Sequence, residues 1–237
     1  MPFSRFRKRI EFFVSYSGEP SKPLNDSMIL FVGCGTGEEA LCLQSIYPEA
    51  DVVGIDIRLP AMRGVAGKID FVLASALNLP FRGYALDFCY CYHVLEHVTD
   101  PVACVSEMAR TLKTEGQLYL STPNIKRLLL YVLSAQEEKM STIISRNAHE
   151  WIARLMHRFS HERGYHTGFT HADLSSILAT SFSEVRFITD AYIFYITKGS
   201  TWQPFARFLS WIHALGIVAP SHAVYCRRPR RSTVKIP

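Results

Sequence analysis

The sequence predicts an α/β fold built on one mostly parallel sheet. Between residues 28 and 123, five short apolar runs alternate with segments of helical periodicity, which is the pattern of parallel strands covered by helices on both faces. The first run ends in glycines at alternate positions, as expected where a strand turns sharply into a helix. Because 237 residues can bury one large core, we expect one domain with helical insertions.

The first elements follow from apolar runs and helix signals. Strands are expected over residues 28–32, 51–56, 69–73, 86–91 and 117–121, and a helix over 38–46. Asp100 and Pro101 predict the start of a helix that runs to about Leu112, because Asp caps helices and Pro suits a first turn.

The later elements carry weaker signals. Thr170 and Asp173 predict a capping box that opens a helix to about residue 180. Residues 182–189 and 223–227 are expected to form a sixth and a seventh strand. A helical excursion is expected between them, over about 198–219.

The glycine loop predicts a nucleotide-cofactor site. Without a Cβ, Gly33, Gly35 and Gly37 allow the backbone to turn with positive φ, which brings N–H groups and a helix N-terminus against a carboxylate or phosphate. Dinucleotide-binding loops read G-x-G-x-x-G, but Glu38 stands in their third glycine position. A nicotinamide oxidoreductase stays an alternative, although the Glu38 carboxylate would repel a pyrophosphate.

The order of motifs resembles the class I S-adenosylmethionine (SAM)-dependent methyltransferases. The G-x-G-x-G loop is followed by a strand that ends at Asp56, by the run Ala74–Phe81, and by His93-Val-Leu-Glu-His97. The last segment is similar to the HVLEH segment of small-molecule methyltransferases of the ubiquinone and menaquinone type. The resemblance covers roughly residues 28–123. It implies a Rossmann-like sheet of seven strands, the seventh antiparallel, and a helical lid.

The resemblance also implies where SAM binds. Its methionine end would lie over the glycine loop, its ribose at Asp56 and its adenine near Ser75–Leu77, where the family usually has an aspartate. A serine hydroxyl offers no charge, so we expect either a lower adenine affinity or contacts supplied by backbone groups of Ala76 and Leu77. The full set of cofactor residues that we expect is Gly33, Cys34, Gly35, Gly37, Asp56, Ile57, Ser75, Ala76, Leu77 and Tyr92.

Two histidines are candidate catalytic bases for transfer to a hydroxyl. His93 and His166 lie nearest the expected mouth of the cleft, and imidazole titrates near neutral pH. Positioning of the acceptor, or a purely structural role, is the alternative for each. A non-catalytic SAM-binding relative that acts as a scaffold is the alternative for the whole chain.

The acceptor is expected to be a small molecule, a sugar or a lipid-linked compound, methylated at oxygen. Tyr92 and His93 stand where enzymes that methylate amino groups of nucleic acids have an Asp/Asn-Pro-Pro-aromatic segment. Nucleic acid is therefore an unlikely partner. The sequence does not indicate the oligomeric state.

No metal is expected at the site. His93, Glu96 and His97 match the inverted zinc-peptidase motif, but they follow a strand and do not lie on a long helix. In some ubiquinone-type enzymes a carboxylate of this segment helps to hold a divalent ion, and His93 stands in its place. His157 and His161 have helical spacing but no evident third ligand.

Charge and apolar patterns divide the rest of the chain. The net charge is +5. The first ten residues contain four basic residues, the last twelve contain five, and neither stretch contains an acidic residue. The two ends of the chain therefore suit solvent or an anionic membrane surface. We expect a cap segment over 1–27, a methyltransferase domain over 28–237, a lid over 124–163 and a basic tail over 227–237. The apolar helix face at Phe3–Val14 suits a cap over the cofactor cleft or a membrane surface. The face at Phe205–Leu215 suits packing against the core or a partner, or a membrane surface.

Cysteine usage and hydropathy predict a cytoplasmic protein that contacts membranes at most peripherally. The six cysteines form no pair of C-x-x-C units, and Cys89 and Cys91 are expected on one buried face of a strand. Reduced thiols fit a reducing compartment. No run of about 20 apolar residues is present for a membrane span.

Overall fold

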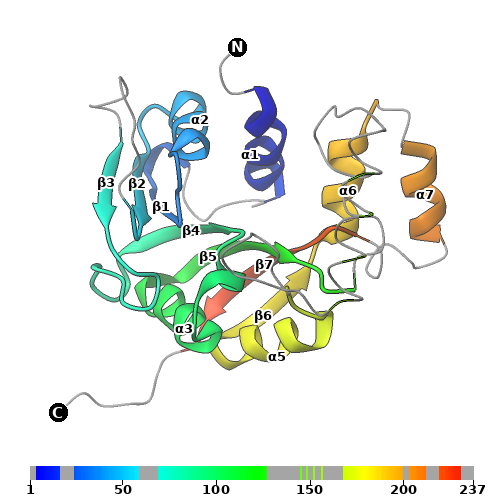
Figure 1. Ribbon diagram of the computed structural model, residues 1–237. Helices are drawn as coiled ribbons and strands as arrows, with labels where there is room; N and C mark the ends of the chain where they lie inside the picture. Colours follow the sequence, from blue (N-terminus) through cyan, green and yellow to red (C-terminus); the bar gives the residue numbers. More distant parts are fainter. Residues whose placement is uncertain are drawn as a thin grey trace.

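The computed structural model shows seven strands in one sheet (Figure 1). It describes residues 4–16, 24–58, 69–126, 168–199, 203–211 and 219–230, together with residues 145, 148, 152 and 156. The strands are β1 Met28–Val32, β2 Asp51–Asp56, β3 Asp70–Leu73, β4 Leu86–Tyr92, β5 Leu112–Pro123, β6 Phe182–Phe187 and β7 Ser221–Pro229.

The strand order confirms the predicted fold. The order is β3-β2-β1-β4-β5-β7-β6. The first five strands pair in parallel, and β7 lies antiparallel between β5 and β6. The carboxyl ends of the parallel strands therefore meet at one edge of the sheet, which is where ligands bind in open α/β folds.

Helices cover both faces of the sheet. Helices α1 Ser4–Tyr16, α2 Glu38–Ile46 and α6 Thr189–Thr197 pack on one face, and α3 Pro101–Thr111 and α5 His171–Ser181 on the other. Helix α7 Gln203–Trp211 packs beside α6. Short 3-10 turns, η1 Leu24–Asp26 and η2 Leu95–His97, precede β1 and follow β4.

Alternation along the strands builds the two halves of the core. Phe31, Tyr90 and Tyr119 face the α1 side, whereas Cys89 and Cys91 face the α3 side, and all five are buried. The prediction that both cysteines share one buried face is confirmed. Successive side chains of a strand point to opposite faces, so strands that are apolar at every position fit a sheet covered on both sides.

Two predicted helix starts are confirmed by their caps. Asp100 Oδ1 accepts a hydrogen bond from Ala103 N–H at 2.9 Å at the start of α3. At the start of α5, Thr170 Oγ1 accepts from Asp173 N–H at 3.1 Å, and the Asp173 carboxylate accepts from Thr170 N–H. Such caps satisfy N–H groups that have no partner within the helix.

Three predicted strands have different bounds in the structure. The sixth strand ends at Phe187, and Thr189 begins α6. Residues 189–197 are rich in aromatic and β-branched side chains, which favour a strand, but tertiary packing buries Tyr192, Ile193 and Ile196 in helical form. The fifth strand is longer than predicted, and the seventh begins at Ser221, two residues before the predicted start.

Much of the predicted lid lies outside the described residues. Where it is described, Met156 N–H donates to Ile152 C=O at 3.0 Å, as in one helical turn, and both side chains are about half exposed, at 52% and 54%. His157, His161 and His166 lie outside the described residues. The roles of residues 124–163 as a lid and of residues 1–27 as a cap stay predictions.

Helix α1 is part of the core. Ile10 and Phe13 are completely buried, and the Phe13 ring packs against Tyr90 and Tyr119. Farther along the chain, Phe205 packs against the same half of the core, whereas Phe208 and Trp211 are exposed. Among the described helices, none has the length and apolar character needed to cross a bilayer.

Candidate cofactor and acceptor site

The glycine loop adopts the conformation that its sequence predicts. Gly33, Gly35 and Gly37 have φ of 65°, 52° and 76°, the left-handed region that disfavours other residues. A Cβ on Gly33 would lie 2.3 Å from Val94 Cγ2, whereas a Cβ on Gly35 would meet nothing within 4 Å. The loop therefore packs closely against the segment after β4 on one side and is open on the other.

Asp56 is fixed beside this loop. Its Oδ2 accepts from Gly35 N–H at 2.9 Å and its Oδ1 accepts from Arg58 N–H at 3.1 Å. Each carboxylate oxygen can accept a further bond. Two oriented acceptors at the carboxyl end of β2 match the paired hydroxyls of a ribose.

Exposed apolar side chains flank Asp56. Ile57 is 72% exposed, and Leu73, which pairs with Asp56 in register, is 60% exposed. Covering such surface stabilises a complex by about 25 cal/mol per Å². An adenine ring is flat and largely apolar, so both side chains suit it. Leu73 was not among the predicted site residues, although its place at the end of β3 follows from the strand register.

The predicted adenine segment forms a tight turn. Ser75 Oγ accepts from Leu77 N–H at 3.2 Å, and Ser75 C=O accepts from Asn78 N–H at 3.1 Å. The Ser75 hydroxyl hydrogen is left to donate to a ring nitrogen. Ala76 is buried beneath the turn, at 8% exposure, so the turn itself is packed on the core.

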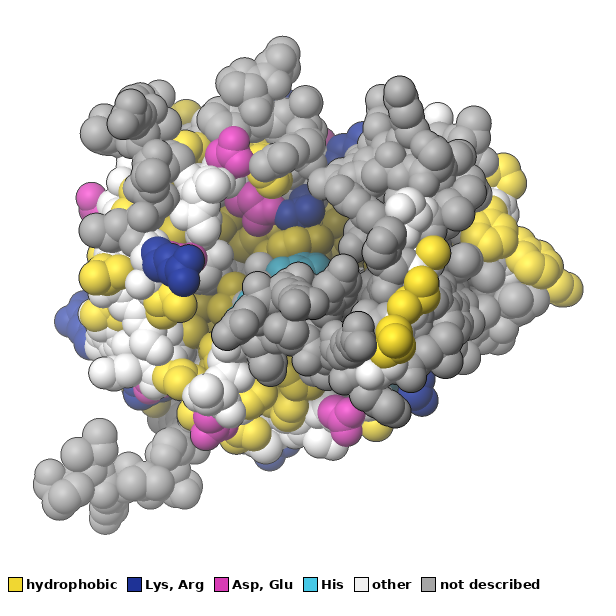
Figure 2. Space-filling view, viewed as in Figure 1, with side chains coloured by type: hydrophobic (Ala, Val, Ile, Leu, Met, Phe, Trp, Pro, Cys, Tyr) yellow, Lys and Arg dark blue, Asp and Glu magenta, His cyan; other side chains and the backbone are white. Residues whose placement is uncertain are grey.

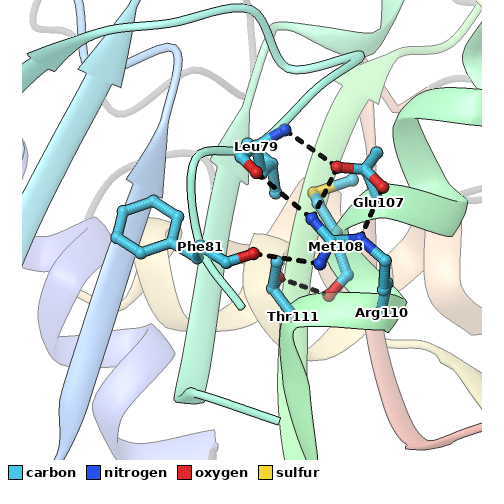
Figure 3. A network of polar contacts seen from close by, with 6 residues as sticks. All are labelled: Leu79, Phe81, Glu107, Met108, Arg110 and Thr111. Carbon is cyan, nitrogen blue, oxygen red and sulfur yellow. Dashed lines mark hydrogen bonds and ion pairs between the residues drawn. The ribbon is translucent and has the colours of Figure 1, made fainter. Parts of the chain in front are cut away.

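An ion pair on α3 holds the residues after this turn (Figure 3). Arg110 donates to the carbonyls of Phe81 and Leu79 at 2.9 and 3.1 Å, and Glu107 accepts from Leu79 N–H at 2.8 Å. Glu107 and Arg110 also pair with each other at 2.6 Å. The hydrogen bond from Arg110 holds the pKa of Glu107 below its ordinary value. The cofactor side of the site is thus preorganised.

His93 lies at the centre of a polar cluster after β4. Its Nε2 is 3.1 Å from Ser221 Oγ, its Nδ1 is 3.3 Å from Glu96 Oε1, and its backbone N–H donates to Ser121 C=O at 2.8 Å. His93 has φ of 54°, a conformation that costs energy for a residue with a Cβ. Its side chain is 36% exposed, so a ligand can reach it.

Glu96 is buried behind His93. Its side chain is 1% exposed, and its Oε2 accepts from Thr122 Oγ1 at 3.1 Å. Burial acts to raise the pKa of Glu96, but the hydrogen bond and charge of His93 together with other local groups lower it below the ordinary value. Glu96 is therefore an ionised carboxylate at neutral pH.

Helix α1 contributes one wall next to this cluster. The Arg9 guanidinium carbon lies 3.6 Å from the centre of the Tyr92 ring, and Arg9 pairs with Glu39. The Tyr92 and His93 rings are 4.4 Å apart. Burial raises the pKa of the Tyr92 hydroxyl, so this phenol stays neutral.

The molecular surface is hollowed where these elements converge. Figure 2 shows a hollow with a hydrophobic floor and with basic, acidic and histidine side chains around it. Burial, followed by the charge of Asp56, raises the pKa of the Cys34 thiol to about 12. That thiol is therefore protonated at neutral pH, which fits a contribution of Cys34 through its backbone. Among the described residues, no three acidic, His or Cys side chains are grouped to hold a metal ion.

The structure brings most predicted site residues together and adds others. The predicted cofactor residues lie along the carboxyl ends of β1, β2 and β4 and the loop after β3, with His93 directly after β4. His166 lies outside the described residues. Glu96, Thr122 and Ser221, which are grouped with His93, were not among the predicted site residues; the antiparallel seventh strand was the signal that could have identified Ser221.

Sequence comparisons agree with this geometry. Residues 30–120 match the family described as "Methyltransferase domain". The ubiquinone biosynthesis O-methyltransferase of Thiobacillus denitrificans is 30% identical over 173 residues, 65% of this chain and 73% of the relative. The protein of the same name from Ralstonia nicotianae is 31% identical over 144 residues, 56% of this chain and 58% of that relative.

Solved structures share the fold. The plantazolicin methyltransferase BpumL in complex with SAH has a TM-score of 0.59 at 18% identity, covering 96% of this chain and 85% of that one. Geranyl diphosphate C-methyltransferase from Streptomyces coelicolor has a TM-score of 0.53 at 16% identity, covering 93% and 79%.

The fold and site define an α/β methyltransferase that uses a nucleoside cofactor. The chain belongs to the class I SAM-dependent methyltransferases, and its cofactor is SAM. This membership favours SAM over the nicotinamide alternative. The chain is only distantly similar to these relatives, since it is 30% identical to the first of them.

Proposed function

We propose that the protein transfers the methyl group of SAM to an oxygen atom of a small molecule. The observation that carries the proposal is the hydrogen-bonded pairing of the positive-φ loop with Asp56, with His93 beside it. The O-methyltransferase names of the relatives from Thiobacillus denitrificans and Ralstonia nicotianae support oxygen as the acceptor atom.

Each part of the site has a role in this proposal. Bound SAM supplies an electrophilic methyl group on a sulfonium. The loop Gly33–Gly37 binds the methionine end, and Asp56 accepts hydrogen bonds from the ribose. Ile57 and the turn at Ser75–Leu77 hold the adenine. Tyr92 lines the cofactor side, and its ring packs beside His93, the final base for the proton that the acceptor loses. Holding the acceptor oxygen near the methyl group and excluding water then accelerate transfer.

A lipid-linked acceptor at the cytoplasmic membrane surface is a narrower form of the proposal. Arg7 and Lys8 on α1 are exposed, and Phe208 and Trp211 on α7 are exposed large apolar side chains. Arg7 also pairs with Glu11. Basic side chains attract anionic lipid headgroups, and exposed apolar side chains can enter the membrane interface. Co-sedimentation with vesicles containing phosphatidylglycerol, and not with purely zwitterionic vesicles, is the expected result.

Calorimetry with SAM tests the cofactor site directly. Asp56→Ala should weaken binding by about 1.5–3 kcal/mol, the range for hydrogen bonds to a charged group. Asp51→Ala is the matched control, because Asp51 is an exposed acid at the other end of the same strand. Well-folded protein that does not bind SAM would contradict the proposal.

A panel of acceptors then tests the chemistry. Catechols, aliphatic alcohols, carboxylic acids and amines would be incubated with SAM, and products located by mass spectrometry and NMR. We expect methyl ethers. SAM binding without turnover on any acceptor would instead favour a non-catalytic scaffold.

A further inference from the structure

The cluster at His93 links three side chains from three separate elements. Glu96 comes from η2, His93 follows β4, and Ser221 begins β7. The three side chains form a chain of two contacts. Glu96 Oε1 is 3.3 Å from His93 Nδ1, and His93 Nε2 is 3.1 Å from Ser221 Oγ. A carboxylate, an imidazole and a hydroxyl in this order can move a proton along the line.

The contact between Glu96 Oε1 and His93 Nδ1 is an ion pair whose geometry falls short of a hydrogen bond, and the ionisation of the carboxylate determines which atom donates across each contact. An ionised Glu96 can only accept, so the His93 Nδ1 that faces it carries a hydrogen. The other ring nitrogen of a neutral imidazole is then an acceptor, and the Ser221 hydroxyl donates to it. This tautomer follows from the hydrogen-bond network. Ser221 is thereby polarised toward loss of its proton.

The surroundings hold the line in place. Thr122 fixes the far oxygen of Glu96, and the backbone N–H of His93 is bonded to Ser121 C=O. The left-handed backbone at His93 is a strained conformation, and such strain persists where neighbouring contacts enforce it, often at functional sites.

The antiparallel strand explains how Ser221 reaches the site. Residue pairing places Ser221 beside Pro123, the last residue of β5. Because β7 runs opposite to β5, its first residue lies at the edge where the parallel strands end. Ser221 is only partly buried there, so an acceptor hydroxyl can approach its oxygen.

We propose that Ser221 and His93 relay the proton from the acceptor hydroxyl, with Glu96 as the positioning residue. This inference rests on the proposed O-methyl transfer. The acceptor O–H gives its proton to Ser221 Oγ, while Ser221 gives its own proton to His93 Nε2. The new bond from oxygen to the methyl carbon forms as the carbon–sulfur bond breaks, and that electron pair stays on sulfur. The imidazolium then releases its proton to solvent.

The charged groups around His93 bear on the pH dependence of the relay. Glu96 faces the ring directly, and its carboxylate stabilises the imidazolium. The Tyr92 ring packs beside the His93 ring, and the Arg9 guanidinium lies over the Tyr92 ring. His97, which follows Glu96 in the sequence, is exposed. The phenol of Tyr92 stays neutral, so Glu96 is the anion whose removal changes proton uptake most.

Two probes of different acidity test the relay. With catechol and SAM, Ser221→Ala should lower kcat by roughly 100-fold, as for loss of general base catalysis, with SAM affinity unchanged. With 4-nitrocatechol, whose hydroxyl ionises more easily, the loss should be much smaller. Ser183→Ala is the matched control, since Ser183 lies on β6 and bonds to Arg228 C=O. Equal losses on both probes, or no loss on either, would overturn the relay.

Glu96→Gln tests the positioning role. Without the carboxylate the imidazolium is less stable, so the acid limb of the pH–rate profile should move to lower pH and kcat should fall. An unmoved acid limb would show that Glu96 acts only in folding.

A spectroscopic measurement separates failure of the relay from failure of the proposed function. ¹⁵N NMR of the wild-type protein should show His93 protonated at Nδ1, and Ser221→Ala should shift the Nε2 resonance. The opposite tautomer would overturn the relay whatever the acceptor. A protein that has the expected tautomer but methylates only nitrogen or carbon atoms would instead contradict the proposed O-methyl transfer. The relay would then have no acceptor hydroxyl to deprotonate.

Discussion

The cofactor side and the acceptor side of the site are built in different ways. On the cofactor side, Gly35 lies in the loop after β1 and Asp56 ends β2, the next strand along the chain, so that the two are 21 residues apart. On the acceptor side, His93 and Ser221 are 128 residues apart and meet only because β7 is inserted antiparallel. In the proposed function, backbone groups of a local loop bind the cofactor, whereas side chains from elements far apart in the sequence surround the acceptor.

The two sides contact each other at Gly33 and Val94, and a substitution there should disturb both. Gly33→Ala places a Cβ 2.3 Å from Val94 Cγ2 at φ of 65°. We expect a loss of about 2–4 kcal/mol in unfolding free energy, from the left-handed backbone and from overpacking. Urea unfolding monitored by circular dichroism measures it, and weaker SAM binding should accompany it.

Two further variants separate the causes of that loss. Gly35→Ala is the control for backbone strain alone, because its Cβ would meet nothing within 4 Å. Combining Gly33→Ala with Val94→Ala removes the closest contact and should restore about half of the loss. Strict additivity in this double-mutant cycle would contradict a packing link between the two sides.

A smaller effect should be confined to the cofactor side. Arg110→Met removes the bonds that hold Leu79 and Phe81 on α3, and should cost about 1–2 kcal/mol of unfolding free energy. Since the Ser75–Leu77 turn is anchored through this segment, SAM affinity should fall while the His93 NMR signals stay in place. Arg186→Met is a control, because Arg186 pairs with Glu184 on β6. A shifted His93 resonance would contradict the independence of the two sides.

The same contrast explains what the sequence could predict. The glycine loop, Asp56 and the Thr170–Asp173 capping box depend on residues close in sequence, so short patterns identify them. Ser221 depends on strand pairing over a long separation, and no local pattern marks it. Helix α6 was missed because Thr189–Thr197 has strand-like composition, and only packing against α1 and the sheet decides its form.

The smallest predicted effect lies on the acceptor side, at His222. This side chain is 1% exposed, and its Nε2 is 3.1 Å from Phe169 C=O. Burial lowers the pKa of His222 below its ordinary value, with the bond to Phe169 acting in the opposite direction. As pH falls below about 6.5, His222 therefore binds a proton in the unfolded chain but stays neutral in the folded protein until the pH is lower.

Stability should accordingly decline on acidification through His222. One proton limits this decline to about 1.4 kcal/mol per pH unit. His222→Gln keeps a donor for Phe169 C=O but does not titrate, so its unfolding free energy should vary less between pH 7 and pH 5.5. Urea titrations at these two pH values measure the difference. A variant with the same pH dependence as the wild-type protein would show that His222 does not contribute to it.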